Sequence, residues 1–585
     1  MANFSSTTLT AGAPRARQGA AARPGGLLRA VPALTMAIFL LPVAAGLIGT
    51  WLPAFGYLPA LGGETLGLAP WRALLAAPGL GTSIRLTLTS GLVATAASLA
   101  LVIGFVAAGH GTRLFARLRR GLAPLLAVPH VAIAIGIAFL IAPSGWAARL
   151  VSPWATGWYL PPDVATIQDP YGLALAAALI VKEVPFLLLM TLAALDQARA
   201  GERLAVARSL GYGPVVAWLK TVLPAVYPQI RLPIYAVLAF SLSVVDMALV
   251  LAPLTPPPLA VQVLRWFNDP DLALRFTAAA GATLQFVLVA SAIGLWRGFE
   301  ILAAKLGRRW LLGGARGGSG LTLRRTTGAA MAALYAVAAM SLLGLALWSL
   351  ARRWRYPDPL PSAWTLDNWA RQVDGLAWAT GTTLIVGLAS ALTALALVLG
   401  CLENEKRHGL TTTGRGLWLL YTPLLVPQVG FLFGAQVLAV AAGIDGTWLA
   451  LVWSHLLFVL PYVFLALADP YRALDERYAR SALCLGASPD RVFWRVKLPM
   501  LLRPVLFALA IGFAVSVAQY LPTLFAGAGR FATLTTEAVA LAGGADRRVM
   551  GVFAFLQSLL PLAAFGLALA VPAWLFRRRR ALRSA

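Results

Sequence analysis

The sequence contains few charged residues. Asp, Glu, Lys and Arg together make up 12% of its 585 residues, about half of the roughly 25% found in soluble globular domains. Hydrophobic residues account for 59%, and the mean hydropathy is +0.77. This composition excludes an ordinary soluble domain and predicts an all-α polytopic protein embedded in a lipid bilayer.

Cysteine is also scarce. The two cysteines, Cys401 and Cys484, have no second potential ligand nearby in the sequence, which argues against a zinc site and a disulfide framework. We interpret both as packing residues. We find no nucleophile triad, carboxylate dyad or metal-ligand spacing, and therefore expect no catalysis, no metal and no cofactor on this chain.

The few lysines exclude one kind of site. A phosphate-binding P-loop needs Gly-Lys before Ser or Thr. None of the five lysines follows a glycine; they are Lys182, Lys220, Lys305, Lys406 and Lys497. This chain cannot hold that ATP site.

Long apolar runs are what the sequence has instead. A run of about 20 residues spans the ~30 Å hydrocarbon core as a helix. Twelve such runs occur, near 31–51, 82–108, 121–143, 171–195, 231–253, 277–296, 327–350, 377–402, 416–440, 447–467, 504–524 and 549–574. We predict twelve transmembrane helices, with tails at 1–30 and 575–585.

The basic residues indicate the topology. With both termini cytoplasmic, the termini and cytoplasmic loops together hold 34 of the 48 lysines and arginines. This asymmetry follows the positive-inside rule and accounts for most of the formal charge of +26 without nucleic acid. We expect a multi-pass protein of the inner membrane. Arg352, Arg353 and Arg355 are an exception on the outer side, where we expect contact with lipid headgroups.

The two halves of the chain are repeats. Ala-Ser-Leu-Ala-Leu-Val-Ile-Gly104 recurs as Thr-Ala-Leu-Ala-Leu-Val-Leu-Gly400, and Pro185-Phe186 as Pro461-Tyr462. We therefore predict two six-helix units, 31–296 and 327–574, joined by a flexible Gly- and Arg-rich cytoplasmic linker at 297–326.

Each repeat contains one polar island between its fourth and fifth spans. The first island, residues 202–224, begins at Glu202, breaks at Gly211 and ends in Leu223-Pro224. The second island, residues 476–499, repeats the thirteen-residue step from glycine to proline. We predict two short helices in each island, with a stop at Gly211 and a start at Pro214. A docking surface and an ordinary amphipathic connector both fit one island alone.

The paired islands resemble the loop motif of permease subunits in binding-protein-dependent ABC importers, especially the double-length permeases of the ferric-iron and thiamine type. The motif is Glu-Ala-Ala, three residues, Gly, nine residues, Ile-x-Leu-Pro. The family's glutamate is replaced by Ala205 and by Arg480, with Glu202 and Glu476 a turn earlier as substitutes. The other matching positions are Ala207, Gly211, Leu223, Pro224, Ala482, Gly486, Leu498 and Pro499.

The resemblance implies a type I importer permease with partners on both sides of the membrane. In that family the loop docks on an ATPase subunit, and an external binding protein delivers the solute. Because both permease halves are fused here, one chain is expected to meet two copies of the ATPase. The resemblance does not identify the solute.

Polar residues inside the spans mark a candidate translocation path, because they are costly in lipid and usually face a cavity or a partner. They are His130, Lys182, Glu183, Asp246, Gln428 and Gln519. Asp246 aligns with Gln519, and His130 with Gln428, across the repeats. We interpret His455 as a hydrogen-bonded interhelical residue. An ion-coupled secondary transporter with two six-helix halves is the main alternative, and a membrane scaffold is another.

Overall fold

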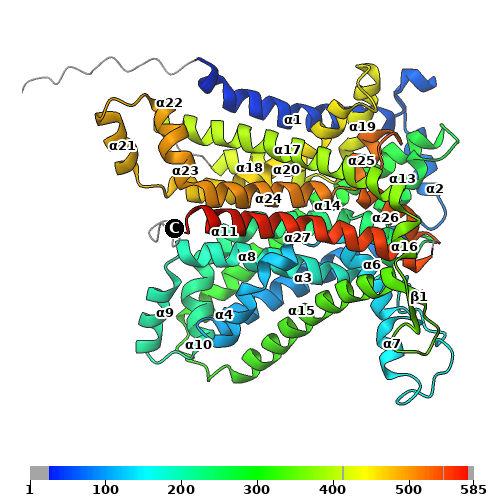
Figure 1. Ribbon diagram of the computed structural model, residues 1–585, viewed down its shortest axis with the longest axis horizontal. Helices are drawn as coiled ribbons and strands as arrows, with labels where there is room; N and C mark the ends of the chain where they lie inside the picture. Colours follow the sequence, from blue (N-terminus) through cyan, green and yellow to red (C-terminus); the bar gives the residue numbers. More distant parts are fainter. Residues whose placement is uncertain (1–25, 411–413, 545, 578–585) are drawn as a thin grey trace, which may run out of the picture.

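The computed structural model describes residues 26–410, 414–544 and 546–577. Most of the chain forms helices that run along the long axis of the molecule (Figure 1). Within the described ranges, ten helices are long and apolar enough to cross a membrane, or up to twelve if two bent pairs each form one span. The all-α polytopic fold predicted from the sequence is confirmed.

The first half contains six main spans and several short helices between them. The spans are α1 (Gly26–Ala54), α3 (Leu80–Gly109), α6 (His130–Ile141), α8 (Leu173–Gln197), α11 (Leu223–Ser243) and α14 (Leu274–Leu312). The short elements are η1 (Pro59–Leu61), α2 (Ala69–Ala76), α4 (Arg113–Arg120), α5 (Leu122–Ala127), α7 (Trp146–Val151), α9 (Ala200–Ser209), α10 (Pro214–Ala217), η2 (Trp218–Val222), α12 (Asp246–Leu251) and α13 (Leu259–Phe267).

The second half repeats this order. Its spans are α15 (Leu321–Leu350), α17 (Val373–His408), α18 (Gly414–Leu425) with α19 (Gln428–Ala441), α20 (Trp448–Arg472), α24 (Leu502–Val517) and α27 (Arg547–Leu575). The short elements are β1 (Ala351–Arg353), β2 (Ala363–Trp364), α16 (Asp367–Ala370), α21 (Glu476–Cys484), α22 (Pro489–Val492), η3 (Phe493–Lys497), α23 (Leu498–Met500), α25 (Leu521–Gly527) and α26 (Leu534–Ala542). Strands β1 and β2 pair antiparallel, with Ala351 opposite Trp364.

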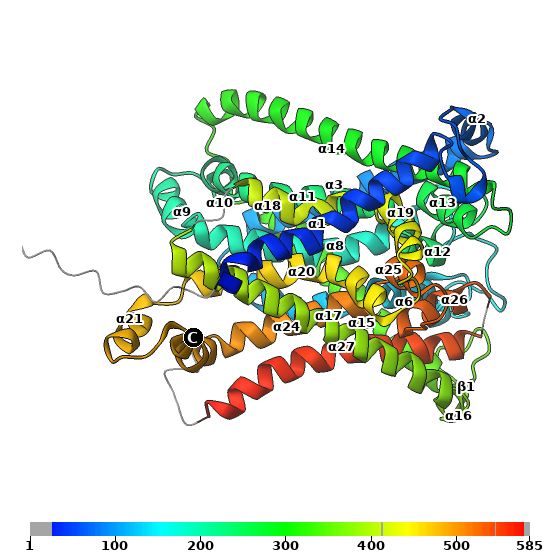
Figure 2. The same cartoon turned by 90° about the horizontal axis from the view of Figure 1, so that it is seen from above.

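The first span of each half packs against the other half. Helix α1 lies against α19 and α17, and α15 lies against α6 and α3. Glycines allow α1 and α19 to approach at their backbones, as is common for helices in lipid: the Gly434 backbone N–H donates to Thr50 Oγ1 at 3.2 Å. The last spans, α14 and α27, lie at opposite edges of the bundle (Figure 2).

The third and fifth spans of each half are broken at related positions. Helices α18 and α19 meet at a bend of 91° before Gln428, and two residues separate the end of α5 at Ala127 from the start of α6 at His130. Pro129 and Pro427 precede these two residues, and proline removes a backbone donor and restricts the residue before it. Helix α11 ends at Ser243 and α12 begins at Asp246, so the predicted run 231–253 is not one continuous helix.

The predicted flexible linker at 297–326 is mostly helical. Helix α14 continues to Leu312 and α15 begins at Leu321, which leaves 313–320 as the non-helical part. That part packs on the first island: the Gly213 backbone N–H donates to the Arg316 carbonyl at 2.8 Å, and Lys220 Nζ donates to the Gly313 carbonyl at 2.6 Å. The expectation of a flexible connector needs correction, because these glycines allow close packing: a Cβ at Gly317 would lie 2.4 Å from Val216.

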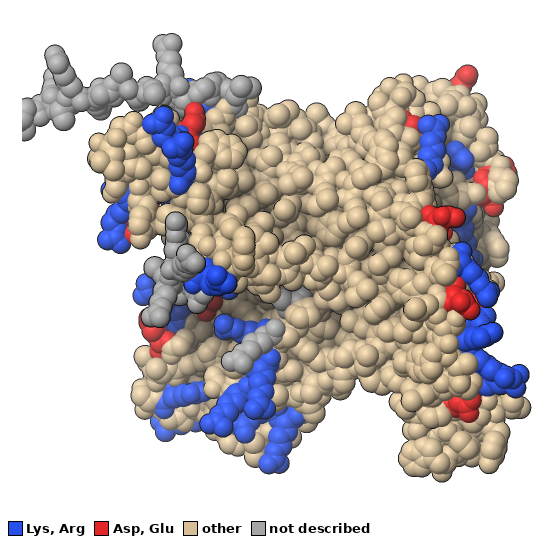
Figure 3. Space-filling view, in the orientation of Figure 1, with Lys and Arg blue, Asp and Glu red and all other residues tan. Residues whose placement is uncertain are grey.

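On the face shown in Figure 3, charged side chains are concentrated at the two ends of the molecule, and the broad band between them shows neither the blue of Lys and Arg nor the red of Asp and Glu. The helices α9 and α21 lie at one end, together with the first described turn of α1 and the end of α27 (Figure 1). Helix α7 lies at the opposite end. This arrangement fits a bundle whose middle faces lipid.

Candidate functional site

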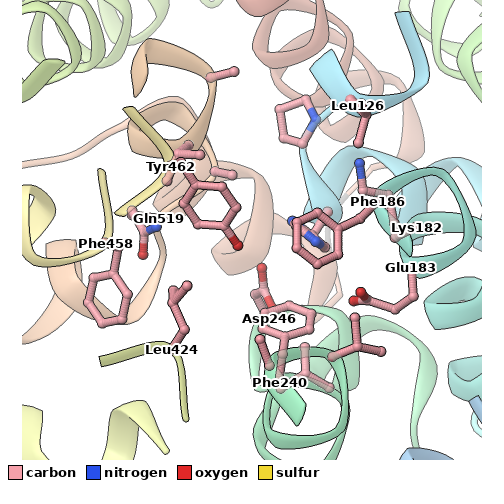
Figure 4. A pocket seen from close by; sticks show the side chains of 18 of the residues that line it. Leu126, Lys182, Glu183, Phe186, Phe240, Asp246, Leu424, Phe458, Tyr462 and Gln519 are labelled. Carbon is pink, nitrogen blue, oxygen red and sulfur yellow. The ribbon is translucent and has the colours of Figure 1, made fainter. Parts of the chain in front are cut away.

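A central cavity of about 210 Å³ lies between the two halves. All six polar residues predicted to mark a path line it: His130, Lys182, Glu183, Asp246, Gln428 and Gln519. Figure 4 shows Asp246 and Gln519 facing the cavity from opposite sides. That these residues contact cargo remains a prediction, but the structure brings them together at one place.

Helix breaks place several of these residues. His130 and Gln428 are the first residues of α6 and α19, Asp246 is the first residue of α12, and Gln519 lies between α24 and α25. Unpaired backbone groups at such breaks are tolerated within a membrane only where protein or a cavity surrounds them. The breaks therefore fit a polar site at the middle of the bundle.

Aromatic side chains complete the lining and were not predicted. Phe186, Phe240, Tyr462 and Tyr520 all line the cavity. The rings of Phe186 and Tyr462, which are equivalent residues of the two repeats, lie 6.3 Å apart. Their equivalence was visible in the sequence as Pro185-Phe186 and Pro461-Tyr462, but aromatic residues are too common in membrane spans to indicate a site.

His455 lies outside this cavity lining and has two partners. Its Nδ1 lies 2.7 Å from Ser516 Oγ, and its Nε2 lies 2.9 Å from Thr523 Oγ1. The interpretation of His455 as a hydrogen-bonded interhelical residue is confirmed. Within the described ranges, no group of three or more His, Cys, Asp and Glu could hold a metal ion.

The two islands share one backbone design. Gly211 and Gly486 have positive φ angles of 83° and 82°. In each island the next residue donates its backbone N–H to a helix carbonyl, Tyr212 to Ala207 and Ala487 to Ala482. These bonds form the Schellman motif, in which glycine ends a helix. A π-helical turn, η2 or η3, then leads to Leu-Pro in both islands.

The second island is held by ion pairs with the end of α17. Glu476 pairs with Lys406 at 2.9 Å, Asp490 with Arg407 at 2.8 Å, and Lys497 with Glu403 at 2.7 Å. The hydrogen bond from Lys406 lowers the pKa of Glu476 from its usual value. The equivalent end of α3 in the first half is Ala107-Ala-Gly-His-Gly111, which carries no carboxylate. The first island is instead held by the inter-repeat segment 313–320.

Both islands expose apolar side chains. In the first, Val206 and Leu210 are about 60% exposed, whereas Leu204 and Ala207 are buried. In the second, Leu485 is 88% exposed and Trp494 is 64% exposed. Cys484 is exposed on α21, so its interpretation as a packing residue is wrong. Its helix has no buried residue.

Comparisons with known proteins identify the family. Residues 416–580 match the family described as binding-protein-dependent transport system inner membrane component. The chain is 34% identical over 525 residues to the inner membrane ABC transporter permease protein YnjC of Escherichia coli K12, covering 88% of this chain and 93% of that protein. The chain belongs to the binding-protein-dependent transport permeases. It is thus the permease subunit of an ABC importer, not the ion-coupled transporter considered as an alternative.

Shorter relatives of this permease match about a quarter of its length. The molybdenum transport system permease protein ModB of Mycobacterium tuberculosis is 32% identical, over 27% of this chain and 65% of its own. The putrescine transport system permease protein PotI of Escherichia coli K12 is 26% identical, over 25% of this chain and 54% of its own. These two names specify different solutes and do not define the cargo here.

Proposed function

We propose that this permease passes a small solute through the central cavity, driven by two copies of a cytoplasmic ATPase, one on each island. The observation that carries the proposal is that both islands lie at the same end of the molecule with the same glycine-to-proline geometry (Figure 1). That end also carries both ends of the described chain, which supports cytoplasmic termini.

The opposite end offers a surface for an external binding protein. The segment after α7 exposes large apolar side chains: Trp154 and Leu160 are each 79% exposed and Tyr159 is 73% exposed. Aromatic residues are enriched at protein interfaces, and an exposed apolar group in such a loop needs a partner or the lipid surface to cover it. We assign this segment to the binding-protein side of the transporter.

Replacing the Leu-Pro pairs tests the ATPase docking. Pro224 and Pro499 are exposed, and Leu223 and Leu498 are half-buried. We expect Leu223→Ala/Pro224→Ala combined with Leu498→Ala/Pro499→Ala to abolish co-purification of the ATPase. The wild-type complex should have the mass of one permease and two ATPase chains by light scattering. Leu232→Ala/Pro233→Ala, the same dipeptide later in α11, is the matched control and should retain the ATPase. Full retention by the fourfold variant would contradict the docking role.

The two islands should contribute unequally. The position of the motif glutamate is occupied by Ala205 in the first island and by Arg480 in the second, and both residues are exposed. The two islands are also held by different contacts. We expect the two Leu-Pro double substitutions, tested separately, to reduce ATPase co-purification to different extents. Equal losses, quantified from the same purification, would count against this asymmetry.

A further inference from the structure

The ammonium group of Lys182 already has hydrogen-bond partners within the protein. Its Nζ donates to the carbonyl oxygens of Val128 at 2.6 Å and Leu125 at 3.2 Å, at the end of α5. A helix C-terminus is a favourable place for a cation. Figure 4 shows the Lys182 ammonium turned toward the segment that carries Leu126 and away from Asp246. Lys182 is therefore a poor counter-ion for a solute in the middle of the cavity.

The two carboxylates of the cavity form no ion pair with any described residue. Glu183 is 5% exposed and Asp246 is 9% exposed. Among the described residues, no hydrogen bond reaches the Glu183 carboxylate, and the Asp246 carboxylate accepts hydrogen bonds from backbone N–H groups, its own and that of Met247, the latter at 2.9 Å. Figure 4 shows both side chains directed into the cavity. A buried charge without a partner is costly, so this arrangement favours a ligand that supplies positive charge.

The charged residues that line the cavity carry an excess of negative charge. Its charged residues within the described ranges are Lys182, Glu183 and Asp246, so full ionisation leaves one uncompensated negative charge. Because a low-dielectric site strengthens interactions between charges, this excess would attract a cation and repel an anion.

The rest of the lining indicates the kind of cation. Phe186, Phe240, Tyr462 and Tyr520 line the site, and the faces of aromatic rings attract ammonium groups. The described residues hold no cluster of three potential metal ligands. The cavity, at about 210 Å³, is smaller than the roughly 300–1,000 Å³ typical of drug-sized ligands. We infer that the central cavity binds a small organic ammonium cation, with Glu183 and Asp246 as its counter-ions.

This inference rests on the proposed passage of solute through the cavity. The test measures the binding of radiolabelled choline to the purified permease–ATPase complex by equilibrium dialysis. We expect saturable binding that is competed by unlabelled choline and not by 3,3-dimethylbutan-1-ol, which has the same shape without the charge. Glu183→Gln/Asp246→Asn should weaken choline binding at least tenfold. Asp196→Asn removes an exposed carboxylate from the same helix as Glu183 and should leave binding unchanged.

Three results would overturn the inference: no carboxylate-dependent choline binding, equal competition by 3,3-dimethylbutan-1-ol, or stronger competition by Mn²⁺ or molybdate than by choline. Co-purification and basal ATP hydrolysis of the wild-type complex separate this inference from the proposed function. A wild-type complex that assembles and hydrolyses ATP but does not bind choline rejects the cation site alone. A permease that recruits no ATPase rejects the proposed function.

Discussion

Replacing Glu403 with Gln is expected to destabilise the permease by about 3 kcal/mol, because removing one member of a buried ion pair leaves the other charges unpaired. The Glu403 side chain is 4% exposed. Its carboxylate accepts hydrogen bonds from the Tyr471 hydroxyl, from Lys497 Nζ at 2.7 Å and from Arg407 Nε at 2.7 Å. The expected result is a clear fall in the melting temperature of the purified protein, measured by intrinsic fluorescence.

The loss should be concentrated in the second island. Lys497 directly precedes Leu498-Pro499, and Arg407 also holds Asp490 in α22. In Glu403→Gln we therefore expect faster amide hydrogen exchange in α21 and α22, with little change in α9 and α10. This measurement separates local release of the second island from general unfolding.

Glu476→Gln is the matched control. It removes another carboxylate between α17 and the second island, but this one is more than half exposed, and exposed ion pairs contribute little. We expect nearly wild-type melting for this variant. If Glu403→Gln and Glu476→Gln had the same melting temperature, the contacts of the buried Glu403 carboxylate would not be what holds the second island.

The sequence alone was sufficient to predict features that depend on a short spacing or on a single side chain. Hydropathy predicted the spans, and the shared step from Gly211 to Pro224 and from Gly486 to Pro499 predicted helix ends that the structure shows as Schellman motifs. Polarity within apolar runs selected six residues that line one cavity. In each case a single side chain or a short spacing carries the physical signal.

Features that depend on distant contacts were not predictable in this way. Glu403 and Lys497 are 94 positions apart, and neither is unusual in its own segment. The glycines at 313–320 indicate flexibility when read alone, yet they pack on Val215 and Val216 of the first island. Hydropathy does not predict that α1 packs on the second half and α15 on the first, because an apolar helix is compatible with both lipid and protein neighbours.

Gly434→Ala is expected to disrupt the contact between the halves. A Cβ at this position would lie 2.0 Å from the Gly46 carbonyl oxygen and 2.7 Å from the Thr50 backbone nitrogen. Both atoms belong to the backbone of α1, so a side-chain rotation cannot relieve the clash, and the two helices must separate. Overpacking typically costs about 1–3 kcal/mol and occasionally more, and here separation also breaks the hydrogen bond from Gly434 to Thr50.

Gly430→Ala, one turn earlier in α19, distinguishes this clash from any general effect of alanine. Its Cβ would meet its nearest neighbour at 3.8 Å, an ordinary contact distance, and alanine favours a helix over glycine by about 1 kcal/mol. In size-exclusion profiles of fluorescently tagged protein, we expect Gly430→Ala to keep the monodisperse peak and Gly434→Ala to lose most of it. Since α1 and α19 come from different repeats, equal peaks for the two variants would mean that the halves do not depend on this crossing.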